Sequence, residues 1–179
     1  MKNVVEILDN KVSKSLQNKI EKYLLHDNFA WYYQDQSLDK STPKKYKNKT
    51  KDSFDDFQFF HTFVNQGKIN SPHINIIIDL LKELKMETAK ILRCKANLKF
   101  KTKTTKKHNV FHVDLPYKHR VMMYYVNDSD GDTYFKIGKT NKKISPKKGR
   151  VLLFNGNIMH AANHPRKTKK RLIINFDMV

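Results

Sequence analysis

The feature that most constrains the fold is the pattern of the chain after residue 90. Short runs rich in β-branched and aromatic residues follow one another there, separated by turn-forming residues, and no helical period interrupts them. The predicted strands are 91–100, 110–115, 121–127, 133–137, 150–154, 157–160 and 171–176. Seven closely spaced strands of this kind favour a β-sandwich or jelly roll.

The first half of the chain has a mainly helical pattern. Apolar residues recur every four positions between residues 10 and 26, which predicts an amphipathic helix. This stripe consists of Val12, Leu16, Ile20 and Leu24. A second helix is predicted after Ser71, which can cap it, with Pro72 in its first turn. Its buried face would hold Ile74, Ile77, Ile78, Leu81 and Leu84. Aromatic-rich runs at 29–33 and 57–64 predict two further strands.

Together these elements predict one α+β domain over residues 1–179. A chain of this length fits one domain better than two and can build a hydrophobic core. We expect residues 1–89 to provide helical support and residues 90–179 to form the jelly-roll core. The stretch 36–56 has little apolar content and carries Pro43, so we interpret it as a mobile, basic, lid-like loop.

The composition excludes several classes of protein. With 39% apolar and 11% aromatic residues, the chain is too apolar for a disordered basic tail. Cys94 is the single cysteine, which excludes an internal disulfide framework and a cysteine-based zinc cluster. No run approaches the roughly 20 apolar residues that span a bilayer, and residues 1–10 lack the apolar core of a signal peptide. We therefore expect a soluble, cytoplasmic protein.

The charge of the chain is strongly positive. It has 36 Lys and Arg residues against 17 Asp and Glu residues, a formal net charge of +19. Such a charge attracts polyanions, which makes nucleic acid a candidate partner. Only five of the cations are arginines, the residue that nucleic-acid readers favour, and the lysines gather in predicted loops at 40–51, 99–107, 142–148 and 167–171. Polyanion binding and the codon bias of an AT-rich genome both stay open as interpretations.

Two familiar motifs are incomplete. The sequence GKT at 138–140 ends like a phosphate-binding loop, but Thr133 stands where that loop needs a glycine. Asp128, Asp130 and Asp132 alternate like the start of a calcium loop, but Lys139 stands where the closing glutamate is required. We interpret the three aspartates as part of a hairpin turn.

Histidines four residues apart occur twice, at His108 and His112 and at His160 and His164. This spacing brings two imidazoles together on a helix. On the strands and loops predicted here it separates them by about 13 Å, so neither pair can share a metal ion.

A different combination of residues can bind a metal. On a strand, His112 and Asp114 point to the same face, so an imidazole and a carboxylate can converge on one ion. His160 could supply a third ligand from a neighbouring strand. Two histidines and one carboxylate form a facial triad, which leaves coordination positions open and is used by non-haem Fe(II) oxygenases. Arg171 opens the last predicted strand and could clamp a dicarboxylate.

These residues lie within a larger ordered pattern. Its segments are 112–116 (HVDLP), 124–128 (YYVND), 130–133 (DGDT), 146–154 (PKKGRVLLF), His160 and 171–176 (RLIINF). In this order they resemble the Fe(II)/2-oxoglutarate-dependent oxygenases, and within them the prolyl-4-hydroxylase-like group. The resemblance implies a double-stranded β-helix, the jelly roll of that family. The first half is similar to the helical support of compact stand-alone members from phage genomes, which would place the protein in the host cytoplasm.

The resemblance also assigns roles to single residues. It implies that His112, Asp114 and His160 bind iron, that Arg171 pairs with the distal carboxylate of 2-oxoglutarate, and that Tyr125 donates a hydrogen bond to that carboxylate. If Arg171 points inward, strand parity places Asn175 near the cofactor as well.

The sequence also departs from the family's pattern. Thr102 occupies a position where many relatives have a tyrosine, and Asn97 could substitute for it. A register slip of one or two residues would bring Lys169 or Lys170 to the position of the clamp.

The implied activity is hydroxylation of a substrate C–H bond. It would consume O₂ and convert 2-oxoglutarate to succinate and CO₂, with Fe(II) as the metal and ascorbate as an optional reductant. The resemblance favours a prolyl residue in a peptide as substrate, and a nucleic acid or a small metabolite stays open because one scaffold hosts many substrates. The interpretation from another class is a non-catalytic basic jelly roll that binds polyanions.

Overall fold

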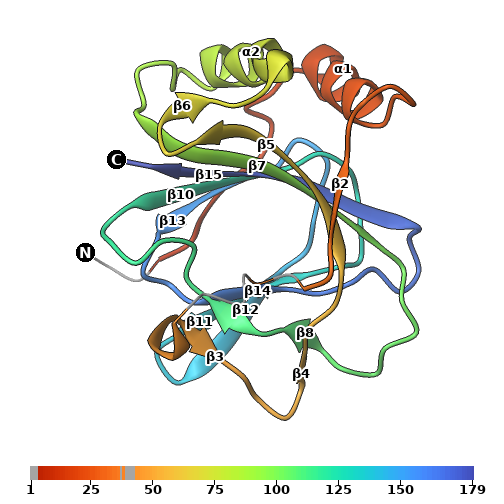
Figure 1. Cartoon of the computed structure of the whole chain (residues 1–179), viewed down its shortest axis with the longest axis vertical. Helices are drawn as coiled ribbons and strands as arrows, with labels where there is room; N and C mark the ends of the chain where they lie inside the picture. The colour runs from red at the N-terminus through yellow and green to blue at the C-terminus, as the bar shows by residue number, and fades with distance from the viewer. Residues whose placement is uncertain (1–3, 37, 39–42) are drawn as a thin grey trace.

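A computed structural model of the chain describes residues 4–36, 38 and 43–179 (Figure 1). Two mainly antiparallel sheets face each other, and two short helices lie against the outer side of the larger sheet. The fold is therefore mostly β and has the sandwich form of a jelly roll. Part of the predicted lid-like loop, residues 37 and 39–42, lies outside the described residues.

The larger sheet has eight strands. Its order is β1 (Glu6–Leu8), β13 (Val151–Asn155), β10 (Arg120–Tyr125), β15 (Lys170–Met178), β7 (Ile91–Phe100), β5 (Gln58–Asn65) and β2 (Tyr32–Gln34), with β6 (Lys68–Ile69) paired to β5. The central strands β10 and β15 are buried along most of their length. One face of this sheet meets the helices and the other meets the interior of the sandwich, so its central strands are covered on both sides.

The smaller sheet has five strands, in the order β12 (Thr140–Ile144), β11 (Thr133–Ile137), β14 (His160–Ala162), β9 (Phe111–His112) and β3 (Lys47–Asn48). A separate short parallel pair joins β4 (Ser53–Phe54) to β8 (His108–Asn109). The segment 43–56 of the predicted lid thus contains a 3₁₀ helix, Lys44–Tyr46, and two short strands.

Both predicted helices are present, and the first is shorter than the predicted 10–26. In α1 (Lys14–Leu24), the Ser13 hydroxyl accepts a hydrogen bond from the backbone N–H of Leu16 at 3.2 Å. A 3₁₀ turn, Pro72–Ile74, leads into α2 (Asn75–Glu83), and the Ser71 hydroxyl caps that turn. These side chains satisfy backbone N–H groups that have no partner within a helix.

The hydrophobic core has two parts on opposite faces of the larger sheet. The first joins the helices to the sheet and includes Leu16, Ile20, Ile77, Leu80, Ala96, Leu98, Ile174 and Phe176. The second fills the sandwich between the two sheets and includes Val121, Met123, Tyr125, Phe135, Phe154 and Ile173. The larger sheet is therefore the layer that both cores share.

The structure corrects the predicted face of the second helix. Ile76, Ile77, Leu80 and Leu81 are its buried residues, whereas Ile78 is 37% exposed. Apolar residues at 76, 77 and 78 fit more than one helical stripe, and contact with the sheet selects among them.

Three loop and strand predictions were also wrong. Lys99 lies on β7, and Lys142 lies on β12, a strand that was not predicted because it is polar and mostly exposed. The predicted strand 110–115 contains only the two residues of β9, since the chain bends after His112. The aspartates at 128–132 link β10 to β11, which belong to different sheets, and therefore do not close a hairpin.

No α-helix among the described residues exceeds the 11 residues of α1, and none is long and apolar enough to cross a membrane.

The corrected face of α2 predicts a difference between two neighbouring substitutions. Ile77→Ala removes a fully buried side chain and is expected to lower the free energy of unfolding by about 2–5 kcal/mol. Ile78→Ala, on the exposed side, should change it by less than about 1 kcal/mol. Urea unfolding followed by circular dichroism measures both, and equal losses would contradict this orientation of α2.

Candidate metal centre and its cavity

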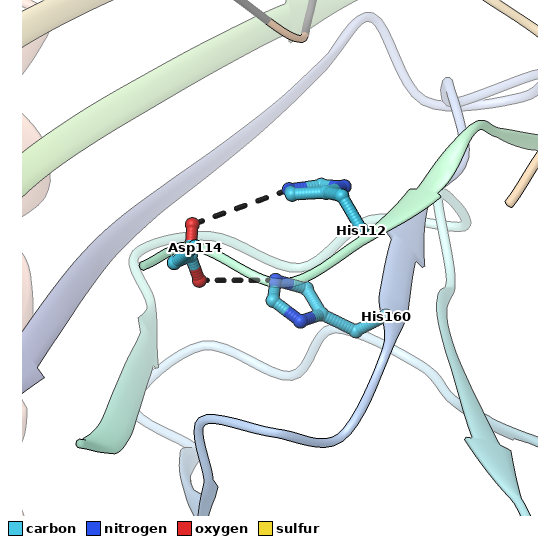
Figure 2. Close-up of side chains that lie close together, drawn as sticks. All are labelled: His112, Asp114 and His160. Atoms are coloured by element: carbon cyan, nitrogen blue, oxygen red, sulfur yellow. Dashed lines mark ion pairs between the residues drawn. The ribbon is translucent and has the colours of Figure 1, made fainter. Parts of the chain in front are cut away.

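Two strands of the smaller sheet and the bend after one of them bring three metal-ligating side chains together (Figure 2). His112 on β9 and His160 on β14 are direct cross-strand partners, with ring centroids 4.8 Å apart. Asp114 follows β9 in the bend and turns its carboxylate toward both rings, 3.3 Å from His160 Nε2 and 4.0 Å from His112 Nε2. One ligand atom from each residue lies within 4.8 Å of the others. The predicted convergence of His112, Asp114 and His160 is present. The bend after β9 brings Asp114 to the histidines, whereas the prediction assumed a continuous strand.

The backbone orients both imidazoles for this arrangement. Nδ1 of His112 lies 3.2 Å from the Val110 carbonyl oxygen, and Nδ1 of His160 lies 3.3 Å from that of Ile158. When each Nδ1 carries the proton and donates it to its carbonyl, each Nε2 keeps a lone pair that faces Asp114. Burial and the neighbouring His160 lower the pKa of His112 to about 4, so this ring is neutral at neutral pH.

Two further residues hold the carboxylate of Asp114. Arg93 on β7 donates from Nη2 to Asp114 Oδ1 at 2.6 Å and from Nε to Asp177 Oδ2 at 2.7 Å. Asn175 on β15 donates from Nδ2 to Asp114 Oδ2 at 3.2 Å. Burial opposes ionisation of Asp114, but His160 and Arg93 hold its pKa well below the usual range.

Sequence reasoning missed Arg93 and Asp177. They face each other across the paired strands β7 and β15, far apart in the chain, so no local pattern connects them. Burial and the charge of Asp114 raise the pKa of Asp177 to about 7 despite its contact with Arg93.

Arg171 lines the same cavity as the triad, at the opposite end. It is 2% exposed, its Nε donates to the Gly131 carbonyl and its Nη2 donates to Thr133 Oγ1, each at 2.7 Å. Within the described part of the chain it forms no ion pair with a carboxylate. A Cβ atom at Gly131 would lie 2.8 Å from Arg171 Cδ, so a glycine leaves room for the guanidinium. The side chain is a buried cation fixed by neutral groups.

Tyr125 also belongs to this end of the site. Its buried hydroxyl lies 2.7 Å from Thr133 Oγ1, and the Arg171 guanidinium lies 5.8 Å from its ring centroid. The Tyr125 hydroxyl and the Arg171 guanidinium thus bond to the same threonine. Burial raises the pKa of Tyr125, which keeps the phenol protonated at neutral pH.

A cavity of about 530 Å³ joins the two ends. Its lining includes His112, Asp114, His160, Arg171 and Asn175, together with Arg93, Lys95, Asn97 and Lys99 from the inward face of β7. The structure thus brings the predicted site residues together, with Tyr125 next to the lining and bonded to Thr133, which is part of it. Asn97, the predicted substitute for a tyrosine, is in the lining, whereas Lys169, Lys170 and Thr102 are not.

Lys99 lies beside Arg171 at the same end of the cavity. It is the cross-strand partner of Arg171 and is itself 2% exposed. Its Nζ lies 3.4 Å from Nε2 of the buried His164. Burial and the charge of Arg171 lower the pKa of Lys99 to about 7, while Asp55 and Asp56 act in the opposite direction.

The fold is shared with several solved oxygenase structures. An oxidoreductase of the 2OG-Fe(II) oxygenase family from Burkholderia pseudomallei superposes with a TM-score of 0.72 and 14% identity, covering 97% of this chain and 84% of that one. A prolyl hydroxylase from Trichoplax adhaerens, in complex with a hypoxia inducible factor peptide fragment, superposes with a TM-score of 0.65 and 14% identity. The match covers 98% of this chain and 83% of that one. HygX from Streptomyces hygroscopicus, with nickel and 2-oxoglutarate bound, superposes with a TM-score of 0.60 and 11% identity. The match covers 97% of this chain and 82% of that one.

No protein-family model matches the sequence, and no curated protein matches it. At identities of 11–14% the structural neighbours establish a common fold. The jelly roll implied by the sequence resemblance is therefore confirmed, and the roles of individual residues stay predictions.

The geometry of the triad predicts which histidines bind a divalent metal. Replacing His112, Asp114 or His160 singly with alanine is expected to weaken Fe(II) binding by at least about tenfold, because each supplies one of three converging ligand atoms. Calorimetric titration without oxygen measures the affinity. His164→Gln, which alters a buried histidine outside the triad, is the matched control, and an equal loss in this variant would contradict the assignment.

Proposed function

We propose that this chain is a single-domain, Fe(II)- and 2-oxoglutarate-dependent oxygenase that hydroxylates a substrate C–H bond. The observation that carries the proposal is the position of Arg171, a buried guanidinium without an acidic partner among the described residues, in the same cavity as a His-Asp-His triad. A buried charge of this kind requires compensation. A cosubstrate with one end on the metal and a carboxylate at the other end would supply it.

The donor set fits the proposed metal. Two imidazoles and one carboxylate suit Fe(II) and leave coordination positions open for further ligands. His112, Asp114 and His160 would hold the ion through the atoms that face one another, and Arg93 and Asn175 would fix the orientation of the carboxylate. The buried Oδ1 of Asn175 has no hydrogen-bond partner among the described residues, so a polar group is also needed beside the triad.

The Arg171 end of the cavity fits a distal carboxylate. Arg171 would pair with this group as a fixed cation, and Thr133 holds the guanidinium in place. Tyr125 would donate a hydrogen bond to the same carboxylate, since its hydroxyl lies beside Thr133 and its ring lies beside the guanidinium. Lys99 would add a second positive charge from the paired position of the neighbouring strand.

When bound, Fe(II) and 2-oxoglutarate would supply the oxidising chemistry, in which O₂ is consumed, 2-oxoglutarate yields succinate and CO₂, and the substrate is hydroxylated. The residues of this chain orient these groups and shield them from water. The low pKa of His112 keeps its imidazole available as a neutral ligand, and the low pKa of Asp114 keeps its carboxylate ionised.

We propose a peptidyl, prolyl-type residue as the substrate. The prolyl hydroxylase from Trichoplax adhaerens, which shares this fold, is in complex with a peptide fragment, and this neighbour supports the proposal. A nucleic acid or a small metabolite is the alternative substrate, and a polyanion-binding jelly roll without activity is the alternative function.

The test of the oxygenase assignment needs no substrate. Adding Fe(II) and then 2-oxoglutarate to the protein without oxygen is expected to produce the weak visible charge-transfer band of a metal-chelated keto acid. His160→Ala should lose the band, and Arg171→Met should require at least about tenfold more 2-oxoglutarate to reach it, because a charge-assisted hydrogen bond is lost. Absence of the band in the unmodified protein would favour the non-catalytic polyanion-binding alternative.

The Lys99 environment predicts proton uptake on cosubstrate binding. With a pKa of about 7, Lys99 is mostly neutral near about pH 8, and an added carboxylate beside it raises that pKa and draws a proton. Affinity for 2-oxoglutarate should therefore fall as the pH rises above about 7. Calorimetry in buffers of different ionisation enthalpy measures the uptake, which Lys99→Met should remove and the exposed control Lys142→Met should retain. Uptake that is unchanged in Lys99→Met would assign it to another group.

A further inference from the structure

We propose that His119 and Asp177 form a buried pair that shares one proton and positions the carboxylate of the metal triad. Asp177 accepts a hydrogen bond from Arg93, which also donates to Asp114. His119 would complete this series of contacts from its far end. The inference rests on the metal centre of the proposed function, and it adds a positioning residue that lies outside the cavity lining.

The series of contacts closes on the loop that carries Asp114. Asp114 and His119 both lie in residues 113–119, which join β9 to β10. Arg93 on β7 contacts Asp114 near the start of this loop, and Asp177 on β15 lies beside His119 at its end. Arg93 and Asp177 contact each other across their paired strands. Both ends of the loop are therefore held to the larger sheet by one connected set of side chains.

The orientation of the His119 ring requires a proton between it and Asp177. Its Nδ1 lies 2.7 Å from the Tyr117 carbonyl oxygen, which can only accept, so Nδ1 carries a proton and donates it. Nε2 of the same ring faces Asp177 Oδ1 at 3.6 Å, and neither atom has a hydrogen-bond partner among the described residues. A neutral imidazole and an ionised carboxylate would present two lone pairs to each other. One shared proton makes this contact attractive.

Burial makes the shared proton more important. The side chains of His119 and Asp177 are 1% and 0% exposed, so water does not compensate for a missing hydrogen bond. Burial and the charge of Asp114 raise the pKa of Asp177 to about 7, so this carboxyl group binds a proton more readily than an exposed aspartate does. A pair with one proton is neutral wherever the proton lies. The charge of Arg93 then balances that of Asp114.

Gly156 leaves the space that the His119 ring occupies. A Cβ atom at this position would overlap with His119 Nε2, so a larger residue would displace the imidazole. The backbone N–H of Gly156 also donates to the His119 carbonyl oxygen at 2.9 Å. The backbone at Tyr117 and at Gly156 therefore fixes the ring in the orientation from which Nε2 faces Asp177.

The first experiment measures Fe(II) affinity by calorimetry without oxygen. His119→Leu removes the shared proton, and we expect it to weaken Fe(II) binding by about three- to tenfold, less than the loss of a residue that contacts a metal ligand directly. His119→Gln can still donate a hydrogen bond from its amide to Asp177. It should restore the affinity to within about twofold of the unmodified protein.

His61→Leu is the matched control. His61 is also buried, and its Nδ1 also lies 2.7 Å from a backbone carbonyl oxygen, that of Ala30. It packs beside Phe63, in the core between the helices and the larger sheet. Its replacement should lower the stability of the protein and leave the Fe(II) affinity unchanged.

A double-mutant cycle tests whether the effect passes through Arg93. Arg93→Met breaks the connection between Asp177 and Asp114, so adding His119→Leu to it should cause no further loss of Fe(II) affinity. Losses that simply add would show that His119 affects the metal centre by another route, and this result would overturn the inference.

A measurement on the unmodified protein keeps the inference testable if His119→Leu does not fold. Nuclear magnetic resonance of protein with ¹⁵N-labelled histidine and ¹³C-labelled aspartate locates the protons, and His119→Gln serves to assign the His119 signals. At neutral pH we expect a proton on His119 Nδ1, together with a second proton either on Nε2 or on the Asp177 carboxyl group. A neutral imidazole beside an ionised Asp177 would overturn the inference.

The outcomes separate this inference from the proposed function. Unchanged Fe(II) affinity in His119→Leu, an equal loss of affinity in His61→Leu, or no recovery in His119→Gln would each overturn the inference. If the unmodified protein shows the visible band of the metal-bound keto acid, the oxygenase assignment stands despite those results. If the band is absent, the oxygenase assignment fails, and the proposed role of His119 at its metal centre fails with it.

Discussion

The antiparallel pairing of β7 with β15 is the constraint on which the rest of the site depends. Its register places Lys99 opposite Arg171, Lys95 opposite Asn175 and Arg93 opposite Asp177, and all of these except Asp177 line the cavity. The alternate residues of both strands, such as Ala96 and Ile174, face the helices. Because the side-chain period of a strand is two, a slip of one residue would exchange these two sets and leave the cavity apolar. The helices therefore support the site indirectly, by packing against the apolar face that keeps this register.

Electrostatic balance decides what the cavity can hold. Buried cations are unfavourable unless an opposite charge compensates them, and the structure compensates them unequally. Arg93 lies between Asp114 and Asp177, and these contacts fix the carboxylate of the metal triad. Arg171 is held by a carbonyl and a hydroxyl, which orient it without neutralising it. The first arrangement stabilises the protein's own geometry, and the second leaves the charge of Arg171 for the proposed cosubstrate.

Local sequence patterns were sufficient for much of the fold. The predicted strands 91–100 and 133–137 coincide with β7 and β11, and the Ser71-Pro72 start signal marks the entry to α2. Predictions failed where tertiary contact overrides the local pattern. The exposed strand β12 is polar because one face of a sheet edge meets water, and Ile78 is exposed although its apolar neighbours are buried. In the site, the sequence placed Tyr125 with Arg171, and both side chains bond to Thr133.

The sequence by itself determined the candidate metal-ligating residue types, their order and the alternation of polar and apolar residues along β7 and β15. It could not reveal which polar face meets water and which encloses a cavity, since both have the same period of two. The tertiary structure decided that His160 pairs with His112, that Arg93 holds Asp114, and that four cations share one lining. These relations join residues distant in the chain. Only the register and stacking of two sheets bring them together, and no local pattern encodes that geometry.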